Sequence, residues 1–188
     1  MSSGKRKYEG EESKMIHKPA AISVENVTAS YGKNVALIGV SAMVEVGSIY
    51  ALLGPSGCGK TTLLSCILAR KKTDSGIIMV NNRYTGDRRS GVPGSSVGFM
   101  PQDICLYQEF TIKETFKYFG SLQSMAKDEI KTRQEELIAM LELPEEDREV
   151  RQMSGGQKRR LSFAVALLHK PRILILDEPT AGVDPIVR

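Results

Sequence analysis

The stretch Gly54-Pro55-Ser56-Gly57-Cys58-Gly59-Lys60-Thr61 decides the fold, because it matches G-x-x-x-x-G-K-[ST] at every fixed position. Residues 49–53 before it form an apolar run that predicts a buried strand, and residues 62–68 after it carry apolar side chains at helical spacing. A strand, a glycine-rich loop and a helix, in that order, make the context that this phosphate-binding pattern requires. A glycine-rich turn with an incidental lysine is the alternative explanation.

The chemistry of such a loop is specific to phosphate. Glycines let the backbone turn its N–H groups toward an anion, and the start of the next helix adds the positive end of its dipole. Lys60 would reach the outer phosphates of a nucleotide, and the Thr61 hydroxyl would hold Mg²⁺. The expected nucleotide-binding residues of this segment are Gly54, Pro55, Ser56, Gly57, Cys58, Gly59, Lys60, Thr61 and Thr62.

Composition narrows the class of protein. A chain of 188 residues can bury an apolar core of its own. Its net charge of +4 is too small to indicate a nucleic-acid-binding surface, so we expect no nucleic-acid partner. The cysteines Cys58, Cys66 and Cys105 are odd in number and lack metal-site spacing, which favours free thiols in a reducing compartment. No run has the length of a membrane span, and the N-terminus has no apolar signal core, so we expect the chain itself to be soluble.

The remaining pattern alternates strands, loops and helices. Residues 1–20 are charged and almost free of apolar side chains, which predicts a disordered tail, and residues 81–95 predict a surface loop. Capping-box spacing from Thr111 to Glu114 predicts one helix, and an amphipathic pattern predicts another over residues 127–141. Strands are expected at residues 22–27, 40–46, 77–80, 96–100 and 173–176, the first two antiparallel. The predicted class is therefore α/β, a P-loop NTPase core with a mostly parallel sheet, an N-terminal antiparallel β subdomain and an inserted α-helical subdomain at about residues 103–157.

Two acids follow the last predicted strand, which is of the fully buried type. Ligands of open α/β sheets bind at the carboxyl ends of the strands, where Asp177 and Glu178 stand. Asp177 could hold a metal against the phosphate oxygens, directly or through water, and Glu178 could polarise an attacking water. A helix N-cap pair is the alternative for these two residues. Upstream, Ser154 opens a helix and is by itself a good N-cap.

With these motifs in this order, the chain resembles the nucleotide-binding domain of an ABC (ATP-binding cassette) protein over residues 21–188. The resemblance makes residues 54–61 the Walker A motif and residues 173–178 the Walker B motif. Met153 stands where the family usually has leucine, a volume-conserving change. The resemblance further assigns Tyr31 to stacking on adenine, Gln102 to the Q-loop, Asp184 to the D-loop, and Ser154, Gly155, Gly156 and Gln157 to the signature.

The resemblance implies ATP and Mg²⁺ as cofactors. Glu178 and Gln102 would be catalytic, and Thr61, Gln102 and Asp177 would ligate the metal. Two cassettes, in a homo- or heterodimer, would sandwich two ATP molecules, each between Walker A of one and the signature of the other. Transmembrane domains, expected C-terminal in the same full-length chain, would hold the cassette at the cytoplasmic face of a membrane and use it to power transport.

The family also places a switch histidine beyond the D-loop, and neither His17 nor His169 stands there. We therefore expect a C-terminally truncated cassette that hydrolyses ATP poorly alone. Residues 99–103, 106–119 and 179–185 look most like the H subfamily, with the A and G subfamilies next. Two alternatives stay open: a truncated, non-hydrolysing nucleotide-binding regulator, and a soluble ABC-type ATPase of DNA repair or translation. The interval from Lys60 to Ser154 is too short for the coiled-coil insertion of a repair ATPase.

Overall fold

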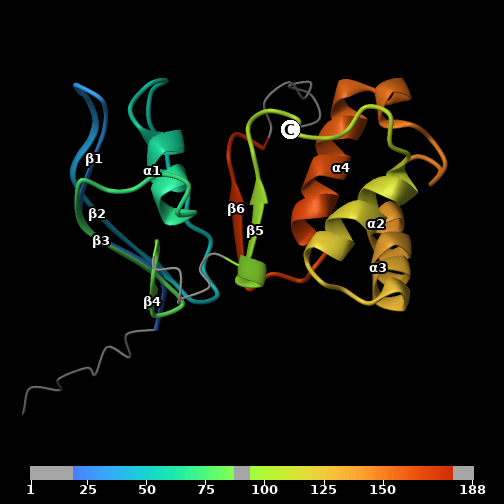
Figure 1. The fold of residues 1–188 in the computed structure, drawn as a ribbon, viewed down its shortest axis with the longest axis horizontal. Helices are drawn as coiled ribbons and strands as arrows, with labels where there is room; N and C mark the ends of the chain where they lie inside the picture. The colour runs from blue at the N-terminus through green and yellow to red at the C-terminus, as the bar shows by residue number, and fades with distance from the viewer. Residues whose placement is uncertain (1–18, 87–93, 180–188) are drawn as a thin grey trace, which may run out of the picture.

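The computed structural model describes residues 19–86 and 94–179. Residues 1–18 of the predicted tail and Asp184 of the predicted D-loop lie outside these residues. Ala20, the last residue of the predicted tail, is instead the first residue of a strand. Figure 1 shows three parts side by side: an antiparallel sheet, a pair of parallel strands, and a group of helices. Two segments form short 3₁₀ helices, η1 (Gly94–Ser96) and η2 (Val150–Gln152).

The antiparallel sheet has the strand order β2-β1-β3-β4. Strand β1 (Ala20–Tyr31) pairs with β2 (Asn34–Glu45) across a two-residue turn, as the alternating pattern predicts. Strand β1 also pairs with β3 (Ser75–Val80), so its inward side chains, such as Val27, enter the core fully buried.

The short strand β4 (Arg83–Tyr84) lies within the segment that was predicted to be a loop. Asn81 and Asn82 connect it to β3 with φ angles of 50° and 60°. Two successive left-handed residues form the tight hairpin turn whose twist matches the flanking strands, and asparagine is one of the residues that tolerates this backbone. The Asn-Asn pair is the sequence signal for this hairpin, and the prediction of a plain loop overlooked it.

The parallel pair consists of β5 (Val97–Met100) and β6 (Ile173–Leu176), aligned from Val97 opposite Ile173 to Met100 opposite Leu176. Helix α1 (Lys60–Ile67) lies between this pair and the antiparallel sheet (Figure 1). Its buried side chains pack with both parts in one apolar core. That core contains Ile22, Val24, Val27, Ala29, Leu37, Leu63, Cys66, Ile67, Leu68, Ile78, Val80, Val97 and Ile175.

The strand predicted at residues 49–53 is absent from the structure. Ile49 is 102% exposed and Leu53 88% exposed, although isoleucine is a strong strand former and both side chains are apolar. A strand needs neighbours that accept and donate its backbone hydrogen bonds. In the described part of the chain β5 and β6 pair only with each other, and residues 49–53 pair with neither strand. For the same reason β6 is less buried than predicted, with Leu174 37% exposed.

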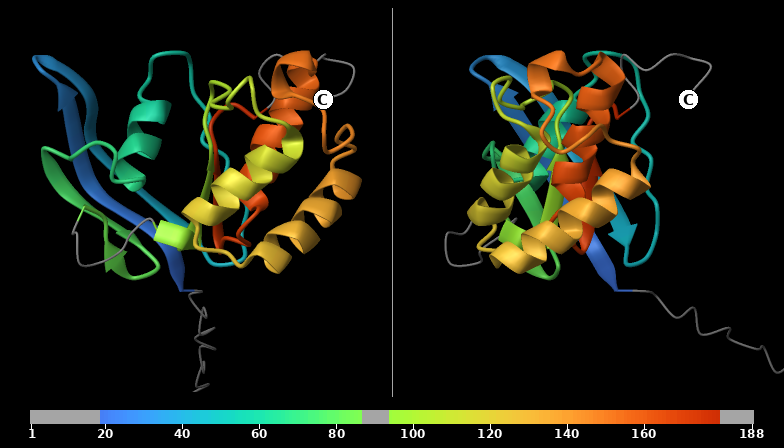
Figure 2. Two further views of the ribbon diagram at one scale, coloured as in Figure 1. Left: turned by 45° about the vertical axis from the view of Figure 1, so that its right-hand side comes forward. Right: turned by 90° about the vertical axis from the view of Figure 1, so that its right-hand side faces the viewer.

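The third part contains α2 (Ile112–Leu122), α3 (Lys127–Met140) and α4 (Gly155–Leu167). Figures 1 and 2 show α4 between the β5–β6 pair and the other two helices. The predicted helices are confirmed. A second apolar core joins the three, comprising Leu106, Ile112, Phe116, Ile130, Leu137, Leu143, Val150, Met153, Leu161, Ala164 and Leu168.

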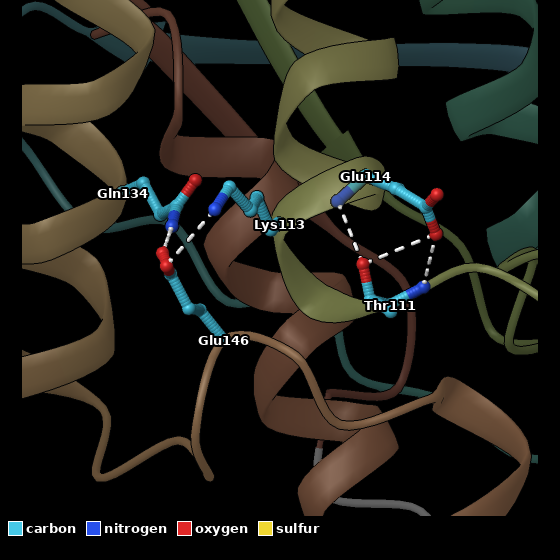
Figure 3. Close-up of polar contacts among 5 residues, drawn as sticks. All are labelled: Thr111, Lys113, Glu114, Gln134 and Glu146. Atoms are coloured by element: carbon cyan, nitrogen blue, oxygen red, sulfur yellow. Dashed lines mark hydrogen bonds and ion pairs between the residues drawn. The ribbon is translucent and has the colours of Figure 1, made fainter.

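Polar contacts fix the start of α2 (Figure 3). The predicted capping box is present: the Glu114 N–H donates to Thr111 Oγ1 (3.1 Å), and the Thr111 N–H donates to Glu114 Oε2 (2.9 Å). This backbone hydrogen bond lowers the pKa of Glu114. Beside the cap, Lys113 forms an ion pair of 3.1 Å with Glu146, which also accepts a hydrogen bond from the buried amide of Gln134. The contacts tie the connector after α3 to both helices.

Candidate nucleotide-binding site

The loop of residues 54–59 is shaped by glycine. Gly59 precedes α1 with a φ of 97°, and a Cβ at this position would lie 2.7 Å from the carbonyl oxygen of Ala36. Both the left-handed backbone and the close approach exclude larger residues. No side chain caps the N-terminus of α1, so its first N–H groups are available to an anion at the loop.

Lys60 folds back over this loop. Its Nζ donates to the carbonyl oxygen of Gly54 (2.8 Å) and to that of Pro55 (2.9 Å), and Cys58 Sγ is 3.9 Å away. The ammonium group is therefore held at the loop by neutral acceptors. An entering phosphate would offer it charged acceptors instead, which form the stronger hydrogen bonds.

Thr61, Gln102 and Asp177 line one cavity of about 250 Å³. The three residues come from α1, from the loop after β5 and from the end of β6, and they are the three predicted metal ligands. Asp177 is 4% exposed, and none of the ion pairs formed within the described residues includes it. Buried carboxylates are normally paired or bind a metal.

The cavity carries a single buried acid rather than an acidic cage. No group of three or more His, Cys, Asp or Glu residues in the described ranges could hold a metal ion. Hydroxyl, amide and carboxylate oxygens are nevertheless the donors that Mg²⁺ prefers, and Mg²⁺ is usually bound by one or two carboxylates together with water and substrate phosphates. The donor set therefore fits Mg²⁺ with phosphate.

Glu178 is exposed and faces Gln102. The Gln102 Nε2 donates to Glu178 Oε2 over 2.9 Å. Glu178 has a φ of 48°, a left-handed backbone that non-glycine residues rarely adopt. It also precedes Pro179, and a residue before proline is normally extended. The structure thus brings the two predicted catalytic residues into contact and holds one of them in a strained conformation.

The predicted signature stands at the start of α4. Ser154 and Gln157 cap the helix reciprocally: the Gln157 N–H donates to Ser154 Oγ (3.2 Å), and the Ser154 N–H donates to Gln157 Oε1 (2.9 Å). A Cβ at Gly155 or Gly156 would meet no atom within 4 Å. The first N–H groups of a helix lack partners inside it, so the N–H groups of these two glycines are donors without intrahelical partners, and the space beside the two Cα atoms is open.

Tyr31, the predicted adenine-stacking residue, and His169, which was excluded as the switch histidine, do not line the cavity. Tyr31 is 55% exposed, and Lys71 Nζ lies 4.0 Å from the centroid of its ring. His169 hydrogen-bonds through Nε2 to the carbonyl oxygen of Val97 (3.3 Å), at the opposite end of β5 from Gln102. Burial lowers the pKa of this histidine, and the Val97 contact opposes that effect in part.

Sequence reasoning missed Arg159. This residue is 5% exposed, and its guanidinium donates to the carbonyl oxygens of Pro101, Gln102 and Glu178. Arg159 stands between Lys158 and Arg160, and a basic run on a helix normally predicts a solvated face. No sequence signal distinguishes it from its neighbours.

Comparison with known proteins gives one consistent result. A family model described as ABC transporter matches residues 37–181. ABC transporter G family member 23 of Dictyostelium discoideum is 46% identical over 166 residues, which are 88% of this chain and 24% of that protein. The linearmycin resistance ATP-binding protein LnrL of Bacillus subtilis is 36% identical over 165 residues, 87% of this chain and 53% of that protein. The chain thus spans between a quarter and about half of these relatives.

Comparison with solved structures gives the same family. The ATP-binding cassette MJ0796, in a dimeric post-hydrolysis state bound to ADP and Pi, is 29% identical with a TM-score of 0.78, covering 88% of this chain and 77% of that one. A G-family relative appears among the matches, while the predicted H subfamily stays a prediction. Within residues 19–86 and 94–179 no helix has the length and apolarity needed to cross a membrane.

Proposed function

Because the chain belongs to the ABC transporter family, we propose that it is an ATP-hydrolysing cassette that powers transport across a membrane. One observation carries this proposal: Thr61, Gln102 and Asp177 converge on a single cavity beside the glycine-rich loop. The three come from distant points of the sequence, and an incidental glycine turn would not require them to meet.

ATP would bind along the loop of residues 54–62. The N–H groups at the start of α1 would donate to the phosphates, and Lys60 would exchange its two carbonyl acceptors for phosphate oxygens. Tyr31 has more than half of its surface exposed and would offer a ring face to adenine. The ammonium group of Lys71 lies over one face of the Tyr31 ring, so adenine would stack on the other face.

Thr61, Gln102 and Asp177 would hold Mg²⁺ with the nucleotide. A metal ion at this place supplies charge neutralisation at the β- and γ-phosphate oxygens. Asp177 would contribute the negative charge, and the metal would compensate the carboxylate for the solvent that burial removes. The hydroxyl of Thr61 and the amide oxygen of Gln102 are neutral donors that orient the site.

Glu178 would orient the attacking water and polarise it. The water oxygen bonds to the γ-phosphorus as the bond to the bridging oxygen of ADP breaks, and the carboxylate accepts a proton from the water. In the structure this carboxylate accepts a hydrogen bond from Gln102, so hydrolysis requires Glu178 to turn at least one oxygen toward the water. Gln102 is therefore poised to report on whether the site is filled.

A second cassette would complete the site. Gly155 and Gly156 carry N–H donors without intrahelical partners beside open space, a suitable place for the γ-phosphate of an ATP held by a partner cassette. The related cassette MJ0796 is dimeric, which supports this arrangement. Asp184, outside the described residues, would lie in the D-loop at the same interface. Transmembrane domains in the same full-length chain would place the dimer at the cytoplasmic face of a membrane.

Nucleotide binding and hydrolysis test the proposal separately. Lys60→Met should weaken ATP binding by roughly 10- to 100-fold, the loss expected for charge-assisted hydrogen bonds, while Lys72→Met, at an exposed lysine, should not. Glu178→Gln should retain ATP binding and lose phosphate release, with the exposed Glu135→Gln as its control. Equal phosphate release by wild type and Glu178→Gln would favour the non-hydrolysing regulator. Absence of ATP binding by the wild-type chain would refute the proposal.

A further inference from the structure

Arg159 is a buried cation in the second turn of α4. Its Nη1 donates to the carbonyl oxygens of Pro101 (3.4 Å) and Gln102, and its Nη2 donates to the carbonyl oxygen of Glu178. Its Nε has no hydrogen-bond partner among the described residues. One guanidinium group thus joins the peptide backbones of the two loops that follow β5 and β6.

Packing alone does not explain an arginine at this position. None of the ion pairs in the described ranges includes Arg159, so its charge is compensated only by carbonyl dipoles. Desolvating a cation is costly, and an apolar side chain of similar volume at a buried site is often neutral or stabilising by comparison. The guanidinium instead provides a rigid fork of donors that point in fixed directions.

The two terminal nitrogens of the Arg159 guanidinium bond to the backbones of the two residues that face each other in the site, Gln102 and Glu178. Glu178 has the strained φ of 48°, and a strained conformation persists only where the surroundings determine it. The hydrogen bond from Nη2 holds the Glu178 peptide group, and the bond from Nη1 holds that of Gln102. Their side chains then meet over 2.9 Å. Arg159 therefore determines how the Gln102–Glu178 pair is aligned.

We propose that Arg159 is a positioning residue that holds the backbones of Gln102 and Glu178 in register and links both to the helix that Ser154 begins. The proposal rests on the proposed function, in which Gln102 faces Mg²⁺ and Glu178 faces the attacking water. Arg159 touches neither nucleotide nor metal in this scheme. Because it stands on α4, a movement of the signature helix would be transmitted to both residues at once.

The test compares three variants of the chain. Arg159→Met removes the fork at similar volume, and Arg159→Lys keeps the charge on a single nitrogen. The matched control is Arg160→Met, because Arg160 is exposed and reaches only the carbonyl oxygen of Glu142 (3.3 Å). The measurements are ATP affinity in excess Mg²⁺, ATP affinity in EDTA, the hydrolysis rate at saturating Mg²⁺-ATP, and the melting temperature.

For Arg159→Met we expect the affinity for ATP in EDTA to stay within about twofold of wild type, because the phosphate loop is untouched. The gain in affinity on adding Mg²⁺ should fall by about tenfold, and the hydrolysis rate by roughly 10- to 100-fold, the range for losing hydrogen bonds from a charged group. Arg159→Lys should lie between Arg159→Met and wild type. Arg160→Met should match wild type in every measurement.

Three results would overturn the proposal. The first is an Arg159→Met protein that folds and keeps the wild-type Mg²⁺ effect and hydrolysis rate. The second is an equal loss of affinity in EDTA and in Mg²⁺, which would assign Arg159 to general stability. The third applies if Arg159→Met does not fold: an Arg159→Lys protein with the same Mg²⁺ effect and hydrolysis rate as wild type would then overturn the proposal. Wild-type protein that binds no ATP would instead refute the proposed function, so the two failures are distinguishable.

Discussion

Gly98 in β5 lies against the C-terminal end of α4, and its replacement by alanine should be costly. A Cβ at this position would lie 2.1 Å from the carbonyl oxygen of Ala166 and 2.7 Å from Cγ of Pro171. Carbon–oxygen contacts between neighbouring elements lie at about 3.3–3.6 Å. The added methyl group therefore requires β5 and the end of α4 to separate by roughly 1 Å.

The size of the expected loss of stability depends on which atom the new methyl group clashes with. Overpacking a close-packed core costs about 1–3 kcal/mol, and a backbone carbonyl cannot turn aside as a side chain can, so we expect the upper end of this range. Alanine also lowers the conformational entropy of the unfolded chain relative to glycine, which offsets about 0.4–1 kcal/mol of this loss of stability. The net loss for Gly98→Ala is about 2 kcal/mol, which corresponds to a melting temperature lower by roughly 4–8 °C for a chain of this size.

The matched control is Gly120→Ala in α2. There a Cβ would lie 2.6 Å from Cγ1 and 2.7 Å from Cδ1 of Ile130, side-chain atoms that can shift more readily than a backbone carbonyl. Alanine also gains about 1 kcal/mol over glycine in a helix interior, so we expect a melting temperature within about 3 °C of wild type. Thermal and urea denaturation followed by circular dichroism measure both variants. The reasoning is refuted if Gly98→Ala melts within about 1 °C of wild type, or if Gly120→Ala is the less stable of the two.

Three further predictions concern titration, thiol reactivity and capping. Burial lowers the pKa of His169 below its ordinary 6.5, so between the folded and unfolded pKa values the unfolded chain binds a proton that the folded chain does not. The free energy of unfolding should therefore be highest above about pH 6.5 and should fall as the pH decreases through this window. His169→Gln can still donate a hydrogen bond to the Val97 carbonyl oxygen, so this variant should not show the decrease when its unfolding by urea is measured at each pH. A thiol reagent should modify the two exposed cysteines and spare Cys66, because Cys66 is buried and burial raises the pKa of its thiol. ATP should protect Cys58, and modification of Cys58 without any loss of ATP binding would contradict its place in the loop. Thr111→Ala should cost about 1 kcal/mol in urea denaturation through loss of the N-cap, whereas an unchanged midpoint would contradict the capping geometry.

Sequence patterns predicted the helices well because their signals are local. The predicted capping box of Thr111 uses residues three positions apart and is present in the structure, and Ser154, predicted as an N-cap, forms a second such box with Gln157. The phosphate loop is equally local, since each of its fixed positions belongs to one turn and the start of one helix. The meeting of Gln102 with Glu178 was predictable only through the family resemblance, because 76 positions separate them in the chain.

The failures concern residues whose state depends on distant neighbours. The apolar run at residues 49–53 has the composition of a strand, but strand formation depends on pairing with a neighbouring backbone, and residues 49–53 form no such pairing in the structure. Arg159 could not be distinguished from Lys158 and Arg160, because its burial arises from the packing of α4 against two loops far away in the sequence. The Asn81-Asn82 turn was, by contrast, a local signal that was overlooked.

The exposed run at residues 49–53 has a consequence for the behaviour of the chain in a cell. Five uncharged residues without proline, with Ile49 and Leu53 in solvent, are the kind of segment that associates with copies of itself and recruits chaperones. We expect the folded chain to bind a hydrophobic dye, and Ile49→Ser with Leu53→Ser to abolish that binding; unchanged dye fluorescence would show that another surface is responsible. Cellular abundance would then depend on how quickly these two side chains become covered, rather than on the stability of either apolar core.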